Sequence, residues 1–319
     1  MRTVRQTQTT LPRVVAFGAI AVIGFLLSAC SDDPGGASGA PSASTVPGAS
    51  AAGSASASVE LDTDLLDRRW TVLFVGLDTD STRASRDEPV SGDALMLVSV
   101  SADQSAVALV SLPRDTVDVP LPDGTTYPAK INALYGEEGL DGLVGAMESL
   151  YEVPIDGYLA LDMDDFALLV DGVGGVEVSP DEPIEDPAAR LEIEAGPQTI
   201  DGSTAEGYVR TRLDQDYGRM GRQQEVIVEI VQGLVDPDRN LDVEALLDGL
   251  ESLDTDLPFD ELPTLLEVAR RSTSAELREL IIQPPLIGFE GDRGDGRGYV
   301  LEPDVDAIRE AERELIPEE

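Results

Sequence analysis

Residues 93–116 read DALMLVSVSADQSAVALVSLPRDT, and this stretch decides the fold. Two apolar runs, 94–101 and 106–112, are joined by the short connection ADQS. Apolar runs of this length predict strands, and so short a connection predicts that they pair as an antiparallel hairpin. If Val100 lies opposite Val107, the same register places Asp93 opposite Arg114. We therefore expect Asp93, Arg114 and Asp115 to lie together at one edge of a sheet.

The neighbouring segments extend this sheet. Residues 70–77, WTVLFVGL, form a continuous apolar run that is typical of a strand buried on both faces. Asp78 follows this strand and joins the same edge if the strand runs parallel to 106–112. Further strands are expected over 155–161 and 277–283. Helices are expected over 140–151, 164–171, 242–253, 259–271 and 303–315. Because strands and helices alternate and mix, we predict an α/β fold, a three-layer α/β/α sandwich with a central mixed β-sheet.

The stretch 203–224, STAEGYVRTRLDQDYGRMGRQQ, holds four arginines in a chain that is otherwise acidic. Ser203 and Glu206 form the pattern of a capping box, which predicts that a short helix begins here. Apolar residues recur at helical spacing farther along and predict a second helix over 217–235. The arginines grouped around the start of that helix are Arg210, Arg212, Arg219 and Arg222.

Arginines grouped at a helix N-terminus indicate an anion site. The free N–H groups and the dipole of a helix N-terminus attract negative charge, and guanidinium groups bind phosphate oxygens in pairs. Arg219 and Arg222 are three residues apart, so they share one face of the helix. The alternative is a solvated turn in which the arginines pair with Asp214 and Asp216. Four arginines together with two glutamines favour the phosphate site.

Composition excludes several classes of function. The 319 residues carry a formal net charge of −40, which argues against nucleic acid as a partner. There is no histidine, which excludes histidine-based triads and the usual zinc sites, so acid–base chemistry falls to carboxylates. Cys30 is the single cysteine, which excludes an intrachain disulfide.

The first 30 residues predict a lipoprotein signal peptide. A basic start precedes an apolar run at 14–27 that is short for a membrane span. The run ends in Leu-Ser-Ala-Cys30, which resembles a bacterial lipobox. Cys30 is therefore expected to carry a diacylglyceryl group, which supplies the second acyl chain that stable anchoring requires. The alternative is a transmembrane anchor with an incidental cysteine.

Composition also divides the rest of the chain. Residues 31–65 are rich in Ser, Ala, Gly and Pro and are expected to form a flexible tether. The remaining segment, 66–319, is expected to be one folded domain that ends in a helical extension over about 237–319.

A series of short motifs across the folded part resembles the LytR-CpsA-Psr family of cell-wall glycopolymer transferases. The motifs are LFVGLD, GDALML, LVSLPRDT, KINALY, GPQTIDG, YVRTR and GRMGRQQ, and the resemblance runs from about residue 72 to 316. It implies an extracytoplasmic phosphotransferase, anchored here as a lipoprotein. Such an enzyme moves a glycopolymer from a polyprenyl-pyrophosphate carrier to peptidoglycan and forms a phosphodiester.

The resemblance implies roles for individual residues. Asp93, Arg114 and Asp115 match the catalytic motifs, and Asp93 with Asp115 matches the positions that hold Mg²⁺ or Mn²⁺. The residues expected to bind the pyrophosphate are Lys130, Arg210, Arg212, Arg219, Arg222 and Gln223. The lipid tail requires a long apolar cleft. Its candidate walls, which are also ordinary core candidates, are Leu95, Leu97, Leu109, Phe166 and Ile227.

One departure from the family pattern motivates a second hypothesis. The family commonly has Arg-Ser-Asp-Thr where this chain has Ser91-Gly92-Asp93-Ala94, so one expected positive charge is missing. Arg83 and Arg86, in the preceding loop, are candidate replacements. Without that charge, the chain fits a non-catalytic lipoprotein that binds polyprenyl-phosphate lipids or wall polymers. A third hypothesis is a solute-binding lipoprotein of a transporter, which would have two similar α/β lobes.

Overall fold

The computed structural model describes residues 61–84, 86, 89–251, 253–257 and 262–315. The predicted signal peptide, the predicted lipidation site Cys30 and most of the tether predicted over 31–65 lie outside the described residues. Helix α2 (Thr63–Leu66) begins within the last residues assigned to the tether. In the described part of the chain, no helix is both long enough and apolar enough to cross a membrane.

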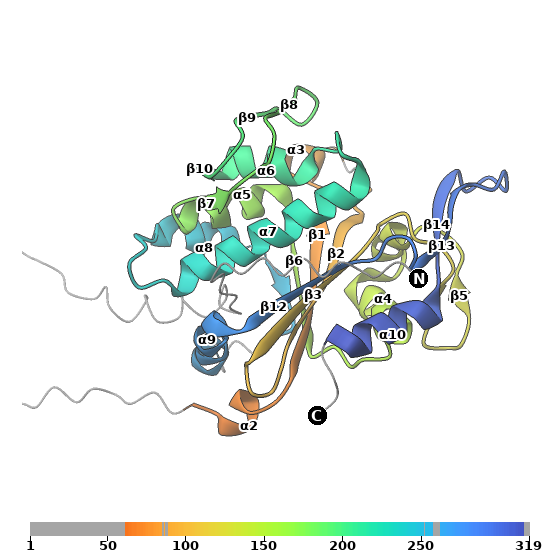
Figure 1. Cartoon of the computed structure of the whole chain (residues 1–319), viewed down its shortest axis with the longest axis horizontal. Coiled ribbons are helices and arrows are strands. Elements are labelled where there is room, and N and C mark those ends of the chain that lie inside the picture. Colours follow the sequence, from red (N-terminus) through yellow and green to blue (C-terminus); the bar gives the residue numbers. More distant parts are fainter. Residues whose placement is uncertain (1–60, 85, 87–88, 252, 258–261, 316–319) are drawn as a thin grey trace, which may run out of the picture.

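A six-stranded mixed sheet forms the centre of the domain (Figure 1). Its order is β11-β6-β1-β2-β3-β12. The strands are β1 (Trp70–Leu77), β2 (Gly92–Val100), β3 (Ala106–Leu112), β6 (Gly157–Leu161), β11 (Asp254–Thr255) and β12 (Glu276–Ile281). Strand β2 is antiparallel to both its neighbours, whereas β6 and β12 run parallel to β1 and β3. The predicted mixed sheet is confirmed.

The central hairpin has the predicted register. Val100 pairs with Val107 and Leu95 pairs with Leu112, so the same register continued outward sets Asp93 opposite Arg114. Because β1 and β3 both run antiparallel to β2, their ends meet the start of β2 at one edge of the sheet. The chain segments that follow β1 and β3 therefore meet at that edge.

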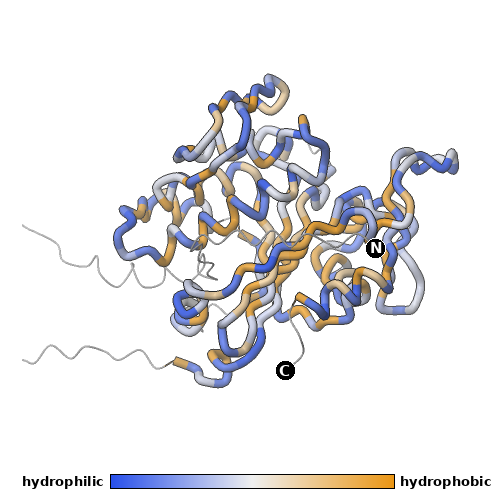
Figure 2. The backbone as a smooth tube through the Cα atoms, viewed as in Figure 1, coloured by the Kyte–Doolittle hydropathy of each residue, from blue (hydrophilic) through white to orange (hydrophobic). Residues whose placement is uncertain are grey.

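Helices cover both faces of the sheet, as Figure 1 shows. Their bounds are α4 (Leu134–Tyr151), α5 (Met163–Gly172), α6 (Gly202–Arg210), α7 (Gln215–Val235), α8 (Val243–Glu251), α9 (Leu262–Arg271) and α10 (Val305–Leu315). Side chains alternate along each strand. Val75 accordingly packs with the core beside α4 and α10, whereas Val72 packs with α7 and α9. The inner strands β1, β2 and β3 are therefore mostly apolar, as Figure 2 shows, whereas the edge strand β12 carries Glu276, Arg278 and Glu279.

Helices α5 to α8 pack around a further core beside the sheet. Two small two-stranded sheets flank it: β7 (Val176–Val178) pairs with β10 (Gln198–Ile200), and β8 (Ile184–Asp186) forms a hairpin with β9 (Leu191–Ile193). The predicted capping box at Ser203 is wrong. Asp201 caps α6 by accepting a hydrogen bond from the Thr204 N–H at 2.9 Å. Gly202 can then approach α5 closely, since a Cβ there would lie 2.1 Å from the Ala167 carbonyl oxygen.

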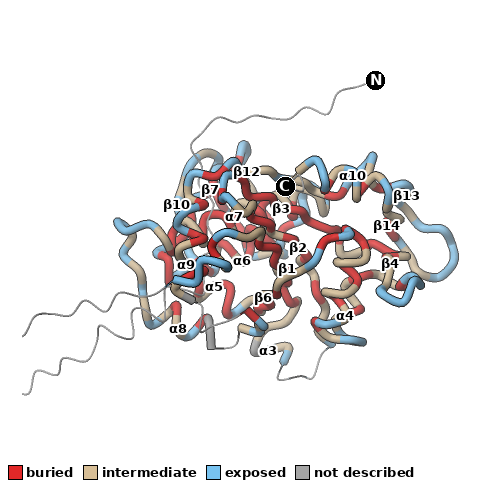
Figure 3. Tube along the Cα trace, turned by 90° about the horizontal axis from the view of Figure 1, so that it is seen from below, coloured by how far each residue is buried: buried red, intermediate tan, exposed pale blue. Residues whose placement is uncertain are grey.

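The described part of the segment 237–319 combines helices α8, α9 and α10 with strands, so it is not helical throughout. Its strand β12 completes the central sheet beside β3, and β13 (Ile287–Asp292) pairs with β14 (Tyr299–Pro303) in a projecting hairpin. Backbone hydrogen bonds fasten this hairpin to the loop after β3: Leu301 N–H donates to the Asp115 carbonyl at 3.1 Å, and Val117 N–H donates to the Leu301 carbonyl at 2.9 Å. The tip of the hairpin is exposed (Figure 3).

Asp165 makes the stability of the folded protein depend on pH. This side chain is 6% exposed, and among the described residues its Oδ2 atom has no hydrogen-bond partner. Burial and the neighbouring Asp162 raise the pKa of Asp165 from 3.8 to about 7. Between these values the folded protein keeps a proton that the unfolded chain releases, so stability falls as pH rises from about 4 to 7.

We expect Asp165→Asn to remove this decline and to unfold at a higher temperature than the unchanged protein at pH 8. Thermal unfolding followed from pH 4 to pH 8 measures the effect. Asp306→Asn, an exposed first-turn aspartate of α10, is the matched control. Equal pH dependence in Asp165→Asn and the unchanged protein would contradict the prediction.

Candidate active site

A cavity of about 410 Å³ lies at the edge where β1 ends and β2 begins. This volume is typical of a small-molecule site. The polar side chains that line it are Asp78, Asp93, Arg114, Asp186, Arg210, Arg212, Arg219 and Gln223. Its apolar lining is supplied by Leu77, Ala94, Met163, Ala188, Ala189 and Val209. One concave site therefore has both a strongly charged wall and an apolar wall.

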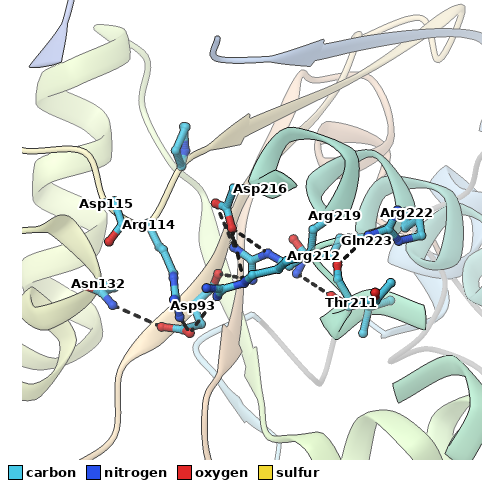
Figure 4. Close-up of polar contacts among 12 residues, drawn as sticks. Asp93, Arg114, Asp115, Asn132, Thr211, Arg212, Asp216, Arg219, Arg222 and Gln223 are labelled. Atoms are coloured by element: carbon cyan, nitrogen blue, oxygen red, sulfur yellow. Dashed lines mark hydrogen bonds and ion pairs between the residues drawn. The ribbon is translucent and has the colours of Figure 1, made fainter. Parts of the chain in front are cut away.

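Three guanidinium groups meet at Asp93 (Figure 4). Arg114, just after β3, forms an ion pair with the Asp93 carboxylate. Arg219, in α7, donates from Nη1 to the Asp93 backbone carbonyl at 3.2 Å. Arg212, in the loop between α6 and α7, brings Nη2 to 4.0 Å from Asp93 Oδ2. We call Arg114, Arg212 and Arg219 the arginine cluster.

The arginine cluster brings three partly buried positive charges close together. Burial, followed by the positive charges of Arg212 and Arg219, lowers the pKa of Arg114. Burial and Arg219 likewise lower the pKa of Arg212. Arginine stays protonated in proteins, so these shifts report the cost of burying the guanidinium groups and, after that, their mutual repulsion. Arg114 Nε is also buried without a hydrogen-bond partner in the described structure. A bound anion would relieve the repulsion and supply that partner.

Asp216 positions two members of the cluster. Its carboxylate accepts two hydrogen bonds from Arg219, from Nε at 3.0 Å and from Nη2 at 3.1 Å. The same carboxylate lies 3.5 Å from Arg212 Nε. The predicted alternative, a turn in which arginines pair with Asp214 and Asp216, thus describes real contacts. These contacts orient the guanidinium groups at the cavity rather than away from it.

Arg222 lies outside the cavity and has a different set of partners. It donates to the carbonyl oxygens of Tyr208 at 2.8 Å and Thr211 at 2.6 Å, and it pairs with Asp214 at 2.6 Å. These groups belong to the end of α6 and the following loop, which carries Arg212. The adjacent Gln223 does line the cavity, and its amide donates to the Val209 carbonyl at 3.3 Å.

The other predicted phosphate ligands are divided between the cavity and its surroundings. Arg210 lines the cavity and pairs with Glu206 at 2.6 Å. Lys130 pairs with Asp115 at 2.8 Å, and neither is part of the cavity lining. The structure therefore brings Asp93 and Arg114 together with Arg210, Arg212, Arg219 and Gln223, while Asp115 and Lys130 form a neighbouring pair.

A sequence model of the LytR_cpsA_psr family matches residues 42–314, which is most of the chain. The chain belongs to the LytR-CpsA-Psr family.

Individual relatives agree with this membership. The polyisoprenyl-teichoic acid–peptidoglycan teichoic acid transferase TagV of Bacillus subtilis is 25% identical over 79% of this chain and 65% of its own length. The corresponding TagU of Enterococcus faecalis is 31% identical over 60% of this chain and 63% of its own. The probable cell wall biosynthesis protein LcpB of Corynebacterium glutamicum is 40% identical over 40% of this chain and 31% of its own. Each match spans less than two thirds of the relative.

Solved structures of the family share the fold. The crystal structure of B. subtilis TagV superposes with a TM-score of 0.64 at 24% identity, covering 78% of this chain and 98% of that one. TagT bound to LI-WTA superposes with a TM-score of 0.61 at 21% identity, covering 80% and 92%. At these sequence identities, the structural similarity establishes the α/β fold alone.

The two carboxylates that the family resemblance assigns to a metal have other partners here. Asp93 Oδ1 accepts hydrogen bonds from Ser91 Oγ at 2.9 Å and Asn132 Nδ2 at 3.2 Å, and Asp115 pairs with Lys130. Among the described residues, no three acidic, histidine or cysteine side chains converge on one point. Magnesium is usually held by one or two carboxylates together with phosphate oxygens and water. Asp93 and Asp115 supply the number of carboxylates that such a site takes from a protein.

The residue that departs from the family pattern takes part in the site. Ser91, where the family commonly has arginine, donates its hydroxyl to Asp93. Arg83 pairs with Asp78 at 2.6 Å, and Asp78 lines the cavity. Arg83 therefore brings a positive charge to the cavity wall, whereas Arg86 is exposed.

The proposed walls of the lipid cleft belong to the core instead. Leu95, Leu97, Leu109, Phe166 and Ile227 pack in three core clusters and do not line the cavity. The apolar lining comes partly from loops, including the β8–β9 connection, which sequence periodicity does not reveal. Asp186 was also missed. It accepts a hydrogen bond from Thr211 Oγ1 at 2.6 Å, which lowers the pKa of the carboxyl group.

Proposed function

We propose that this LytR-CpsA-Psr protein transfers a cell wall glycopolymer from a polyprenyl-pyrophosphate carrier to peptidoglycan. The observation that carries this proposal is the convergence of Arg114, Arg212 and Arg219 on a cavity that also has an apolar wall. A lipid-linked diphosphate has the matching chemistry, since its charged head requires guanidinium donors and its carrier requires apolar contact. The relatives named teichoic acid–peptidoglycan transferases support a wall glycopolymer as the substrate.

In this proposal the diphosphate lies against the arginine cluster, with Arg210 and Gln223 at its side. The start of the lipid carrier lies along Leu77, Met163 and Val209. Lys130 holds Asp115 beside the cluster, and Arg222 holds the loop that carries Arg212. The preorganised guanidinium groups are positioned to stabilise the negative charge of the transferred phosphoryl group.

The proposed reaction is a displacement at phosphorus. A hydroxyl oxygen of the acceptor forms a bond to the phosphorus that carries the glycopolymer. The bond from that phosphorus to the bridging oxygen breaks, and polyprenyl phosphate leaves with the electron pair. The hydroxyl proton goes to Asp115 or Asp93, whichever keeps a carboxylate oxygen that is not engaged with the metal. A Mg²⁺ or Mn²⁺ ion held by Asp93, Asp115 and phosphate oxygens would supply further charge neutralisation.

The test is transfer by the purified protein. With a lipid-linked glycopolymer, peptidoglycan and Mg²⁺, we expect release of polyprenyl phosphate together with covalent attachment of the polymer to the acceptor. Thin-layer chromatography of radiolabelled lipid measures the first product, and label in washed peptidoglycan measures the second. Chelation of the dication should reduce both products.

The Ser91 departure supports a second candidate, a non-catalytic protein that binds polyprenyl-phosphate lipids or wall polymers. It would retain the lipid through the same arginine cluster and release no polyprenyl phosphate with any of several donors. Donor binding without turnover would therefore select this candidate over the transferase. A solute-binding protein with two similar lobes is excluded for the described residues, because they are organised on one central sheet. Lipidation of Cys30 and an extracytoplasmic location stay predictions.

A further inference from the structure

The Asp186 side chain joins two separate segments that line the cavity. One is the β8–β9 connection, which supplies part of the apolar lining, and the other is the end of α6 with the loop that follows it. Asp186 Oδ1 accepts hydrogen bonds from the N–H groups of Ala188 at 3.0 Å and Ala189 at 3.3 Å. Its Oδ2 accepts a hydrogen bond from Thr211 Oγ1 at 2.6 Å. We call the hydrogen bond between Asp186 and Thr211 the clasp.

The clasp is buried, and both carboxylate oxygens of Asp186 are engaged. Asp186 is 9% exposed and Thr211 is 1% exposed. The Thr211 hydroxyl lowers the pKa of the Asp186 carboxyl group, so the clasp is a charge-assisted hydrogen bond. Gly207 lets α6 lie directly beside the hairpin (Figure 1), because a Cβ there would lie 2.8 Å from the Ala189 carbonyl oxygen. A carboxylate with these partners acts on the site through its neighbours.

Arg212 is the member of the arginine cluster that depends on the clasp. The Asp216 carboxylate accepts hydrogen bonds from Arg219 at 3.0 Å and 3.1 Å, whereas it lies 3.5 Å from Arg212 Nε. The position of the Arg212 guanidinium group therefore depends more on its own backbone. Thr211 directly precedes it and is held twice, since its carbonyl accepts from Arg222 at 2.6 Å and its hydroxyl forms the clasp.

We propose that Asp186 and Thr211 are positioning residues, whose hydrogen bond fixes Arg212 relative to the apolar wall of the cavity. The biological ligand rests on the proposed function, in which a diphosphate meets Arg212 while its hydrocarbon chain meets the apolar wall. Thr211 is not part of the cavity lining, so its effect on binding must pass through its neighbours. The competing explanation is that the clasp only stabilises the folded domain.

Binding of inorganic pyrophosphate, measured by calorimetry, tests the clasp without any transfer reaction. Thr211→Val removes the hydroxyl group, keeps the branched shape and leaves every arginine in place. We expect it to raise the Kd about tenfold, the scale of one hydrogen bond to a charged group. Thr211→Ser keeps a hydroxyl group and should restore most of the affinity.

Thr264→Val is the matched control for the loss of a buried hydroxyl group. Thr264 lies in α9, is 1% exposed, and accepts a hydrogen bond from the Asp62 N–H at 3.1 Å. It is not part of the cavity lining. We expect Thr264→Val to lower the unfolding temperature as Thr211→Val does and to leave the Kd for pyrophosphate unchanged.

Transfer kinetics extend the test to the lipid-linked donor. In Thr211→Val the donor KM should rise more than kcat falls, because Arg114 and Arg219 keep their own partners. Unchanged Kd and KM values in Thr211→Val would leave only the stabilising role and overturn the proposal. Equal rises in Thr264→Val would overturn it as well, because the effect would then follow from instability alone. If the unchanged protein binds pyrophosphate but releases no polyprenyl phosphate, the transferase proposal fails, and the Kd values alone decide the role of the clasp.

Discussion

Replacing Arg219 with alanine is expected to lower the rate of glycopolymer transfer at least about 100-fold, the cost of removing one preorganised charge-stabilising donor. Arg219 is 4% exposed and connects α7 to the start of β2. Its guanidinium group is held by Asp216 and donates to the Asp93 carbonyl. Its guanidinium group is therefore fixed before substrate arrives. Release of polyprenyl phosphate under saturating donor measures the loss.

Three further measurements make this result specific to the site. Arg219→Lys keeps the charge and loses the paired hydrogen bonds, so we expect it to recover only a small part of the rate. Arg270→Ala removes an exposed arginine that pairs with Glu267 and should transfer at the normal rate. Circular dichroism should show the same secondary structure in all variants. If folded Arg219→Ala transferred the polymer at a rate within about threefold of the unchanged protein, Arg219 would not be part of the proposed diphosphate site.

Replacing Arg222 with alanine should instead lower the free energy of unfolding, by about 3 kcal/mol. Its side chain satisfies the carbonyl oxygens of Tyr208 and Thr211 in a buried setting, and its loss leaves both acceptors without these bonds. The ion pair with Asp214 adds less, because that carboxylate is half exposed and screened by solvent. Urea unfolding followed by circular dichroism measures the change, again with Arg270→Ala as the control.

The Arg222 result also distinguishes two roles. The sequence resemblance assigns Arg222 to the pyrophosphate, whereas its contacts assign it to the support of the loop that carries Arg212. A destabilised Arg222→Ala with reduced transfer agrees with the support role. If the variant were as stable as the unchanged protein and still failed to transfer, direct phosphate contact would be the better explanation.

The sequence predicts those parts of the site that depend on strand pairing. Two apolar strands with a short connection allow few registers. The predicted register places Asp93 opposite Arg114, and in the structure these two residues form an ion pair. The clustering of arginines around the start of α7 follows from helical spacing and was equally accessible. The local sequence pattern is sufficient for these features because they depend on contacts between segments that are close in sequence.

The parts that escaped prediction depend on how distant elements pack. Arg219 and Arg222 are three residues apart in α7, yet their partners differ. Arg219 contacts Asp93 at the cavity, whereas Arg222 contacts the end of α6, which packs beside α7. Asp186 reaches the cavity through a small hairpin whose position no periodicity reveals. Strands β13 and β14 were not predicted, and the structure bonds their hairpin to the distant loop after β3.

Strand β12 has a consequence for how the molecule is assembled. It lies beside β3 in parallel, although most of the domain separates the two in sequence. Pairing across so long an intervening segment is slow, because the chain loses the entropy of a large loop before it gains the contact. Until residues 276–281 arrive, the edge of β3 presents unpaired backbone groups in an apolar strand, a template for aggregation. We therefore expect a truncated chain that ends before residue 276 to aggregate more readily than the full chain.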